Sequence, residues 1–209
     1  MNLAPTLLDI FSARNGEALR TQLQHALRQG ALTCYVHPLG FYFVRLATEG
    51  KMSLRLHYWP ASHREDGSAI TPYHDHVWRL QSFILSGAIE NVMLDLIEDE
   101  LGQFQLAQIN QVGGVDEVIP SGRAVSIKEQ SRQRLTAGDF YEIEARKFHY
   151  TDVPPNQAAI TVVRADIVVE GGPRTLVPAG LRVGMRPRVI LSKHHKKFRM
   201  RSLRSSKRN

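Results

Sequence analysis

Hydrophobic and polar positions follow a helical spacing at the start of the chain. Thr6 and Asp9 have the spacing of a capping box beside the first apolar residues. Further along, an i, i+4, i+7, i+8 stripe of apolar residues marks a second amphipathic helix. These residues are Leu19, Leu23, Ala26 and Leu27. The pattern predicts two short helices, packed on the rest of the protein, within residues 1–30.

From residue 31 the pattern changes to short β-prone runs separated by Gly, Pro, Asn or Asp. The runs are 32–37, 41–46, 53–59, 81–87, 90–98, 104–109, 124–129, 139–144 and 158–169. Many short strands at this spacing predict an antiparallel sandwich or barrel over residues 31–170. Residues 171–192 are rich in Pro, Gly and Arg, and we expect them to wrap around the barrel.

The positive charge of the chain is concentrated at one end. The 209 residues carry 27 Lys and Arg against 20 Asp and Glu, a formal net charge of +7. Residues 193–209 hold eight of these basic residues and no acidic one, which leaves 19 basic against 20 acidic residues elsewhere. The body is therefore near neutrality. We predict a disordered basic tail at 193–209 that is able to bind nucleic acid or another polyanion.

Several classes of protein do not fit this sequence. No apolar run approaches the roughly 20 residues that span a bilayer, and residues 1–16 lack the pattern of a signal peptide. The single cysteine, Cys34, excludes an intrachain disulfide framework and a cysteine-rich zinc module. We expect a soluble, cytoplasmic protein without a membrane partner.

Histidine spacing supplies the main chemical signal. His74 and His76 stand two residues apart in a β-prone run, and such residues point to the same face of a strand. Both imidazoles can therefore enter one barrel interior and share a metal. His149 follows the run 139–144 as a third candidate ligand. Three neutral nitrogens on one face leave positions open for substrate and for O₂ or water.

These residues resemble the two motifs of the cupin superfamily. His74, His76 and Gly87 match the spacing of the first motif, and Gly138 and His149 keep the interval of the second. The resemblance implies a mainly β fold, the cupin double-stranded β-helix or jelly-roll barrel. Two short N-terminal helices and the basic C-terminal tail would be attached to it.

The chain departs from the usual cupin pattern in ways that narrow the resemblance. The usual carboxylate ligand is replaced by Leu80 or Gln81, and the Pro and second Gly of the second motif by Glu144 and Arg146. Three histidines without a carboxylate resemble the thiol dioxygenases, the cysteine dioxygenase branch. The run 50–60, GKMSLRLHYWP, is similar to that branch as well.

The resemblance implies roles for residues near the histidines. An arginine in the position of Arg45 pairs with the substrate carboxylate in that branch, because its planar guanidinium binds a carboxylate in a bidentate way. Gln81 would lie near the metal and hydrogen-bond a bound ligand. Tyr73 is one candidate proton or hydrogen-bond donor, alongside Tyr141 and Tyr150. If Arg55 points inward, it is a second substrate clamp.

Two features of the thiol dioxygenases are missing, so the substrate stays open. The cysteine that crosslinks to a tyrosine would fall at Gln81, and the Ser-x-His-x-Tyr element would fall near 160–166, where neither His nor Tyr occurs. The resemblance implies a mononuclear non-haem Fe(II) oxygenase or dioxygenase that acts on a small thiol or an amino-acid-like substrate with O₂. Three histidines also accept Ni, Mn, Co, Cu or Zn.

Two other functions fit the same residues. One is a non-catalytic cupin that senses a metal or small ligand and binds a polyanion through residues 193–209. The other is a metal-dependent isomerase or lyase, which would work without O₂. Cupins often dimerise, so a homodimer is part of what the resemblance implies.

Overall fold

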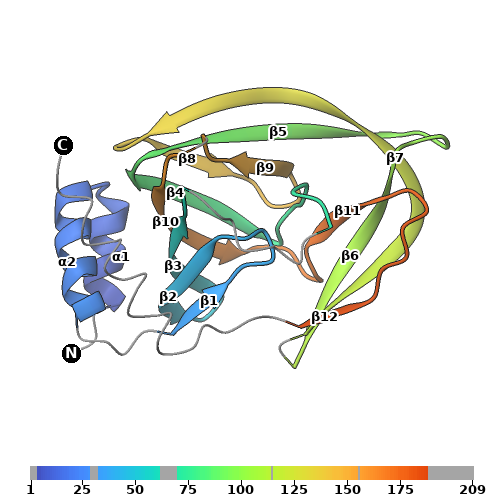
Figure 1. Cartoon of the computed structure of the whole chain (residues 1–209). Helices are drawn as coiled ribbons and strands as arrows, with labels where there is room; N and C mark the ends of the chain where they lie inside the picture. The colour runs from blue at the N-terminus through green and yellow to red at the C-terminus, as the bar shows by residue number, and fades with distance from the viewer. Residues whose placement is uncertain (1–3, 29–32, 62–69, 114, 155, 188–209) are drawn as a thin grey trace.

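The computed structural model describes residues 4–28, 33–61, 70–113, 115–154 and 156–187 (Figure 1). The helices are α1 (Ala4–Ser12) and α2 (Gly16–Arg28). A first sheet has the strand order β1 (Cys34–Val36), β2 (Tyr42–Glu49), β3 (Met52–Trp59), β10 (Ala159–Ile167), β4 (Trp78–Ser86) and β8 (Phe140–Ile143). A second sheet has the order β11 (Arg174–Pro178), β6 (Phe104–Val112), β7 (Val115–Thr136), β5 (Ala88–Glu98) and β9 (Phe148–Asp152), with β12 (Met185–Pro187) paired to β7.

The chain alternates between the two sheets and pairs antiparallel throughout. It passes from β4 to β5, returns at β8, and crosses again at β9, β10 and β11, so that β10 lies between β3 and β4. This winding is a double-stranded β-helix, or jelly roll. The predicted mainly β cupin-type barrel with two short helices is confirmed. The predicted basic tail, 193–209, lies outside the described residues.

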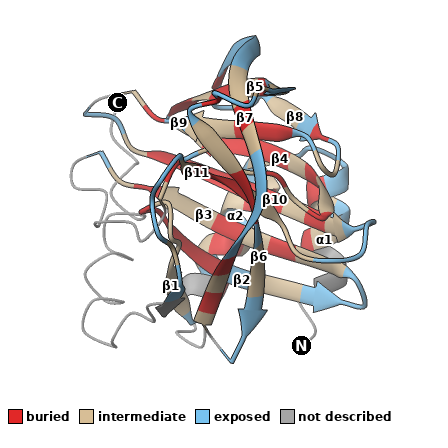
Figure 2. Ribbon diagram, turned by 90° about the vertical axis from the view of Figure 1, so that its right-hand side faces the viewer, coloured by how far each residue is buried: buried red, intermediate tan, exposed pale blue. Residues whose placement is uncertain are grey.

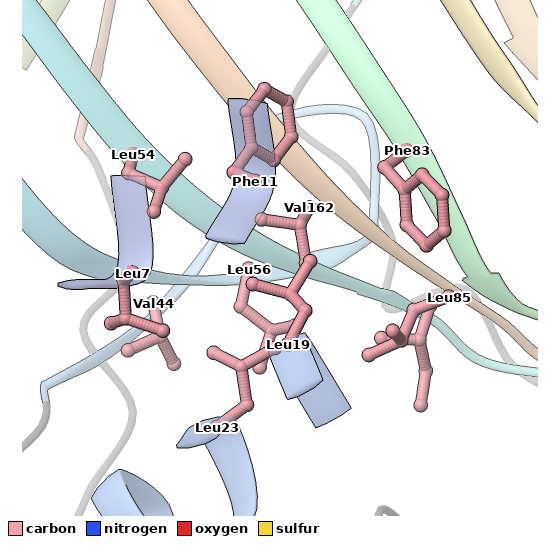
Figure 3. Packing of buried hydrophobic residues seen from close by; sticks show 11 residues of the cluster. Leu7, Phe11, Leu19, Leu23, Val44, Leu54, Leu56, Phe83, Leu85 and Val162 are labelled. Atoms are coloured by element: carbon pink, nitrogen blue, oxygen red, sulfur yellow. The ribbon is translucent and has the colours of Figure 1, made fainter. Parts of the chain in front are cut away.

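The two helices cover the outer face of the first sheet. Their apolar stripes place Leu7, Phe11, Leu19 and Leu23 at most 2% exposed. They pack on outward-facing residues of four strands, chiefly Val44, Leu54, Leu56, Phe83, Leu85, Ile160 and Val162 (Figure 3). Neither helix in the described part of the chain is long and apolar enough to cross a membrane.

The helix starts follow different residues from those that the sequence suggested. The Asn15 side chain accepts a hydrogen bond of 3.0 Å from the Ala18 amide and so caps α2. Helix α1 already includes Ala4, so Thr6 lies inside the helix rather than at its N-cap. The capping-box prediction for Thr6 is therefore wrong, because the helix already begins at Ala4, two residues before the residue that was expected to cap its N-terminus.

Strand alternation determines which residues of the first sheet face the barrel interior. On β4, Phe83 and Leu85 pack under the helices, whereas Leu80 and Ile84 belong to interior clusters. Figure 2 shows buried residues, in red, on the strands of both sheets. The same alternation on β3 turns Leu54 and Leu56 outward.

Strand β7 is longer than the hydrophobic pattern predicted. The run 124–129 indicated a short strand, but β7 starts at Val115 and continues through Pro120 to Thr136. Its pairing with β6 shifts register between Gln105 and Ala107, and nearby the Ser121 hydroxyl donates to the Leu106 carbonyl at 2.8 Å. A β-bulge thus accommodates the Pro-Ser-Gly segment that suggested a turn.

Gly87 is required by the turn from β4 to β5. Its φ is +76°, and a Cβ there would collide with the backbone carbonyl of Ala158 and lie 2.8 Å from the Ala159 Cα. Gly138 has a φ of +99° but open space around it. We expect Gly87→Ala to lower the free energy of unfolding more than Gly138→Ala, whose cost is only the roughly 1–2 kcal/mol of left-handed strain. Chemical denaturation of both variants measures the difference, and equal losses would contradict the collision argument.

Candidate metal centre

The segment before β4 joins the two edges of the second sheet at His74. His74 forms isolated bridges to His149 in β9 and to Thr175 in β11, the two edge strands of that sheet. The His74 amide donates to the His149 carbonyl at 3.1 Å, and the His149 amide donates to the His74 carbonyl at 2.9 Å. This backbone pairing holds two histidines side by side although 75 positions of sequence separate them.

Three imidazoles converge at this junction. One ring nitrogen from each of His74, His76 and His149 lies within 4.8 Å of the others. The Nε2 atoms of His76 and His149 are 3.1 Å apart. Two nitrogens bound to one ion at about 2.0–2.1 Å lie about 3 Å apart when the angle at the ion is near 90°. The three histidines therefore fit a single metal ion and could bind one.

Hydrogen bonds fix the orientation of two of these rings. The Nδ1 atom of His149 lies 3.2 Å from Oδ1 of Asn91, and Nδ1 of His74 lies 2.8 Å from the Pro72 carbonyl oxygen. Both partners only accept, so both Nδ1 atoms carry the proton and the Nε2 lone pairs are free to bind a metal. The His76 ring stacks on Trp78, with the ring centroids 4.6 Å apart.

Burial keeps the three histidines in their neutral form. Desolvation lowers the pKa of His74, His76 and His149 below the usual 6.5, and the neighbouring imidazoles lower those of His76 and His149 further. Neutral imidazole is the form that binds metal ions, so protons compete weakly at this site near neutral pH.

Asn91 is expected to strengthen metal binding through His149. Asn91→Leu removes the acceptor of the His149 Nδ1–H, and loss of such an outer partner costs about 10–100-fold in metal affinity. Asn91→Asp keeps an acceptor at the same place and is expected to retain the affinity. Competition with a chromogenic chelator for Zn²⁺ measures both variants. Equal affinity in Asn91→Leu and the unmodified protein would contradict this role.

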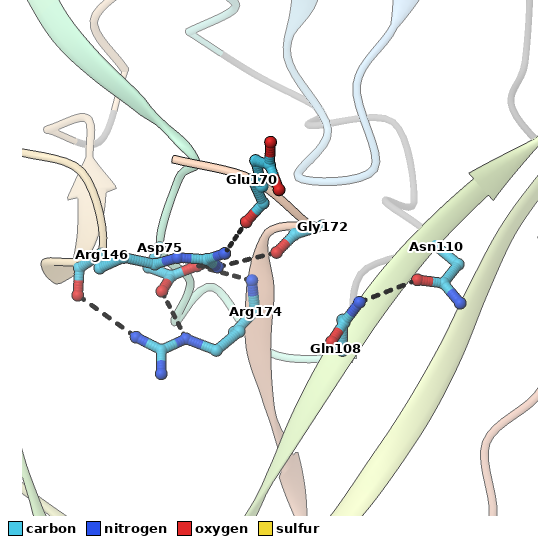
Figure 4. A network of polar contacts seen from close by, with 7 residues as sticks. All are labelled: Asp75, Gln108, Asn110, Arg146, Glu170, Gly172 and Arg174. Carbon is cyan, nitrogen blue, oxygen red and sulfur yellow. Dashed lines mark hydrogen bonds and ion pairs between the residues drawn. The ribbon is translucent and has the colours of Figure 1, made fainter. Parts of the chain in front are cut away.

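Asp75 lies between His74 and His76 in the sequence, and its carboxylate contacts the side chains of Arg174 and Arg146 (Figure 4). Its carboxylate is fully buried and accepts from the Arg174 backbone amide and from Arg174 Nε, both at 2.6 Å. Arg146 Nη1 lies 3.7 Å from the same carboxylate. Since His74 and His76 flank Asp75, these contacts fix the direction of both imidazoles.

Arg146 occupies the position where the cupin motif has its second glycine. Its φ is +66°, the left-handed region that favours glycine. Its guanidinium donates to the carbonyls of Gly172 and Glu170, both at 2.8 Å, and its backbone amide donates to the His76 carbonyl at 2.8 Å. These contacts, together with the ion pair to Asp75, offset the backbone strain.

A cavity of about 190 Å³ opens beside the histidines. This is smaller than the roughly 300–1,000 Å³ typical of drug-sized ligands, so it suits a small molecule. Arg45 and Arg55 both line it, as do His74, His76 and Trp78. The inward direction of Arg55, which the sequence left open, is thereby settled. Its neighbour His57 lies inside the barrel, where burial and then Arg55 lower its pKa to about 3.

Gln81 and Tyr73 are not brought to the cavity. Gln81 shares the outer face of β4 with Phe83, and its side-chain amide donates to Glu142 at 2.9 Å. Leu80 is the inward residue of that pair. Tyr73 packs edge-on against Phe104 and Tyr150, at 5.5 Å between ring centroids in both cases. The position of the Gln81 side chain follows from strand alternation, which the motif spacing does not reveal.

Several residues that shape this centre were not predicted from the sequence. Asn91, Arg174 and Asp116 come from remote strands, and no local pattern connects them with the histidines. His37 also lines the cavity, and its Nδ1 accepts the Leu39 amide at 3.2 Å. Asp75 was visible in the HDH segment itself, where a carboxylate between two inward histidines was a usable signal.

Comparison with solved structures returns proteins of low sequence identity. No protein-family model matches the chain, and no curated protein sequence matches it. The DMSP lyase DddQ from Ruegeria pomeroyi DSS-3 is 19% identical, with a TM-score of 0.39 over 68% of this chain and 54% of the lyase, so the chain spans about half of its length. The polyketide cyclase RemF from Streptomyces resistomycificus is 12% identical, with a TM-score of 0.41 over 73% and 82% of the two chains. A cupin-like protein from Thermotoga maritima is 12% identical, with a TM-score of 0.38 over 66% and 77%.

Proposed function

We propose that this chain is a mononuclear non-haem iron oxygenase that acts on a small thiol or an amino-acid-like molecule. The observation that carries the proposal is the convergence of three neutral imidazoles on one point at the wall of a small cavity that also holds arginines. Three facial histidines leave the opposite positions of an ion open, as a catalytic site requires.

The donor set supports iron as the metal, although it does not select it. His74, His76 and His149 would hold the ion, and Fe(II), when bound, supplies the redox chemistry with O₂. Nitrogen donors suit Fe(II) and also Zn, Cu, Ni, Co and Mn. No carboxylate is among the three grouped ligands, which is the feature that resembles the thiol dioxygenases.

The residues of the chain itself would bind and orient the substrate. Arg45 and Arg55 would hold an anionic group such as a carboxylate, because a guanidinium donates to two oxygens at once. Apolar residues, among them Phe43, Ile109 and Val118, would exclude water from the rest of the molecule. Holding one end against the arginines would direct the other end toward the histidines.

O₂ consumption tests the proposal directly. The purified protein is loaded anaerobically with Fe(II) and then exposed to O₂ in the presence of cysteine, other small thiols and amino acids. We expect O₂ uptake with at least one of them, and none in a His76→Ala variant. Bound iron without O₂ uptake for any compound would overturn the oxygenase. Product formation under anaerobic conditions would instead indicate the isomerase or lyase.

A further inference from the structure

The cavity beside the histidines has walls of opposite charge. Arg45 on β2 and Arg55 on β3 come from the first sheet, whereas Gln111 on β6 and Asp116 on β7 come from the second. All four residues line the same cavity as His74, His76 and Trp78. A ligand that fills this space therefore meets cationic groups on one side and an acidic group on the other.

Aromatic contacts position the cationic wall. The Arg55 guanidinium lies 5.1 Å from the centroid of the Trp78 ring, and its Nε donates to the Ser53 hydroxyl at 3.1 Å. The Arg45 guanidinium lies 5.6 Å from the Tyr35 ring centroid. Within the described ranges, no carboxylate forms an ion pair with Arg45. Contact of a guanidinium with a ring face is compatible with hydrogen bonds from the edge of the guanidinium to an anion.

The acidic wall is built by a hairpin. Gln111 and Asp116 lie directly opposite each other across the β6–β7 pairing, and the Gln111 side-chain amide donates to the Asp116 carboxylate at 3.3 Å. Asp116 is an acidic residue that is only 6% exposed. A buried carboxylate costs free energy unless opposite charge or hydrogen bonds compensate it. A cationic group on the ligand would add to that compensation.

We propose that the cavity binds a small zwitterion, with its anionic group against Arg45 and Arg55 and its cationic group against Asp116 and Gln111. The middle of the molecule then faces His74 and His76, the two histidines of the metal centre that line the cavity. This proposal rests on the proposed function only in that ligand and metal share one cavity. A ligand with a single charge interacts favourably with one wall only, so the two walls together favour a zwitterion over simple acids and simple amines.

Matched ligand series test the charge requirement. The zwitterions glycine, β-alanine and 4-aminobutyrate are compared with acetate, propionate and butyrate, and with the corresponding alkylamines, by calorimetry on the metal-free and the Zn²⁺-loaded protein. We expect the best zwitterion to bind at least about tenfold more tightly than its acid or its amine, since one charge-assisted hydrogen bond has about this effect. Equal binding of the zwitterion and its acid, or no binding of any zwitterion, would overturn the proposal.

Variants locate the two halves of the preference. Asp116→Asn is expected to make the zwitterion and the corresponding acid bind with equal affinity. Arg55→Met is expected to make the zwitterion and the corresponding amine bind with equal affinity. Glu117→Gln removes the same charge one residue along β7, outside the cavity lining, and should leave the preference unchanged. Because Asp116→Asn risks misfolding, Gln111→Glu provides a second measurement: a second carboxylate on the wall should increase the affinity for amines. An unchanged ratio in both variants overturns the acidic wall.

The outcomes separate this proposal from the oxygenase. Calorimetry does not depend on iron, O₂ or turnover, so the ligand preference is measured even if the iron-loaded protein consumes no O₂. In that case the proposed oxygenase activity is wrong, and the proposed binding of a zwitterion is still supported. If O₂ is consumed with simple thiol acids and the zwitterions bind no more tightly than the acids, the oxygenase activity is supported and the proposed binding of a zwitterion is wrong.

Discussion

Replacing His149 with alanine is expected to abolish stoichiometric metal binding. His149 Nε2 lies 3.1 Å from His76 Nε2, and Asn91 holds the ring so that this nitrogen faces its partners. The loss should exceed the roughly 10–100-fold effect that removal of an outer hydrogen-bond partner has on metal affinity. Metal analysis after dialysis against Fe(II), Co²⁺ or Zn²⁺ measures the stoichiometry, and a chelator competition measures the affinity.

His57→Ala is the matched control for that experiment. His57 is also a buried barrel histidine, but its ring packs against Phe41 and Trp59, and it is not among the three grouped ligands. We expect the His57→Ala variant to keep its metal and the His149→Ala variant to lose it. Circular dichroism should show that the barrel stays folded in both variants. Full stoichiometry in His149→Ala would overturn the assignment of the metal centre.

The sequence could predict the pair His74 and His76 because the relevant rule is local. Residues i and i+2 of an extended segment share a face, so two histidines at that spacing converge wherever the strand is placed. His149 was a third candidate ligand because it follows the run 139–144, and its interval from Gly138 added the support of the resemblance. The structure places it within β9 rather than after a strand, and the backbone bridge to His74 makes the three rings converge.

The same local rule explains why Gln81 was misplaced. His76, Trp78 and Leu80 share one parity and face inward, so Gln81 faces outward with Phe83. Motif spacing allowed either Leu80 or Gln81 at the position of the carboxylate, and strand parity chooses Leu80. The alternation of inward and outward residues along this strand could therefore have shown from the sequence that Leu80, and not Gln81, faces the interior.

The acidic wall and the supports of the histidines were beyond prediction for a different reason. Asn91, Asp116 and Arg174 reach the centre through strand pairings that join distant parts of the chain. A change of one residue in register would turn each of these side chains to the other face of its strand. The register that places Asp116 opposite Gln111 follows an irregularity in the β6–β7 pairing, between Gln105 and Ala107, which no hydrophobic pattern reveals.

Replacing Asp75 with alanine is expected to lower the free energy of unfolding by about 3–5 kcal/mol, the usual cost of breaking a buried ion pair by removing one partner. Asp75 is fully buried, and its two contacts with Arg174 are both 2.6 Å long. Asp166→Ala is the control, because Asp166 pairs with Arg164 at 2.9 Å but stays partly exposed. A pair near the surface contributes about 0–1 kcal/mol. Urea denaturation of both variants measures the contrast.

The Asp75 prediction also concerns the metal, because one carboxylate holds the segment that carries two of its ligands. Arg174→Met leaves the buried carboxylate with Arg146 at 3.7 Å as its remaining charged contact, so this single change should destabilise the protein more than the double variant Asp75→Leu/Arg174→Met does. Metal affinity should fall in both, since His74 and His76 lose their anchor although no ligand is changed. If the double variant is the less stable of the two, the carboxylate is not held chiefly by charge. If stability falls while metal affinity is retained, the network supports the barrel and leaves the orientation of the histidines to the bridges between His74, His149 and Thr175.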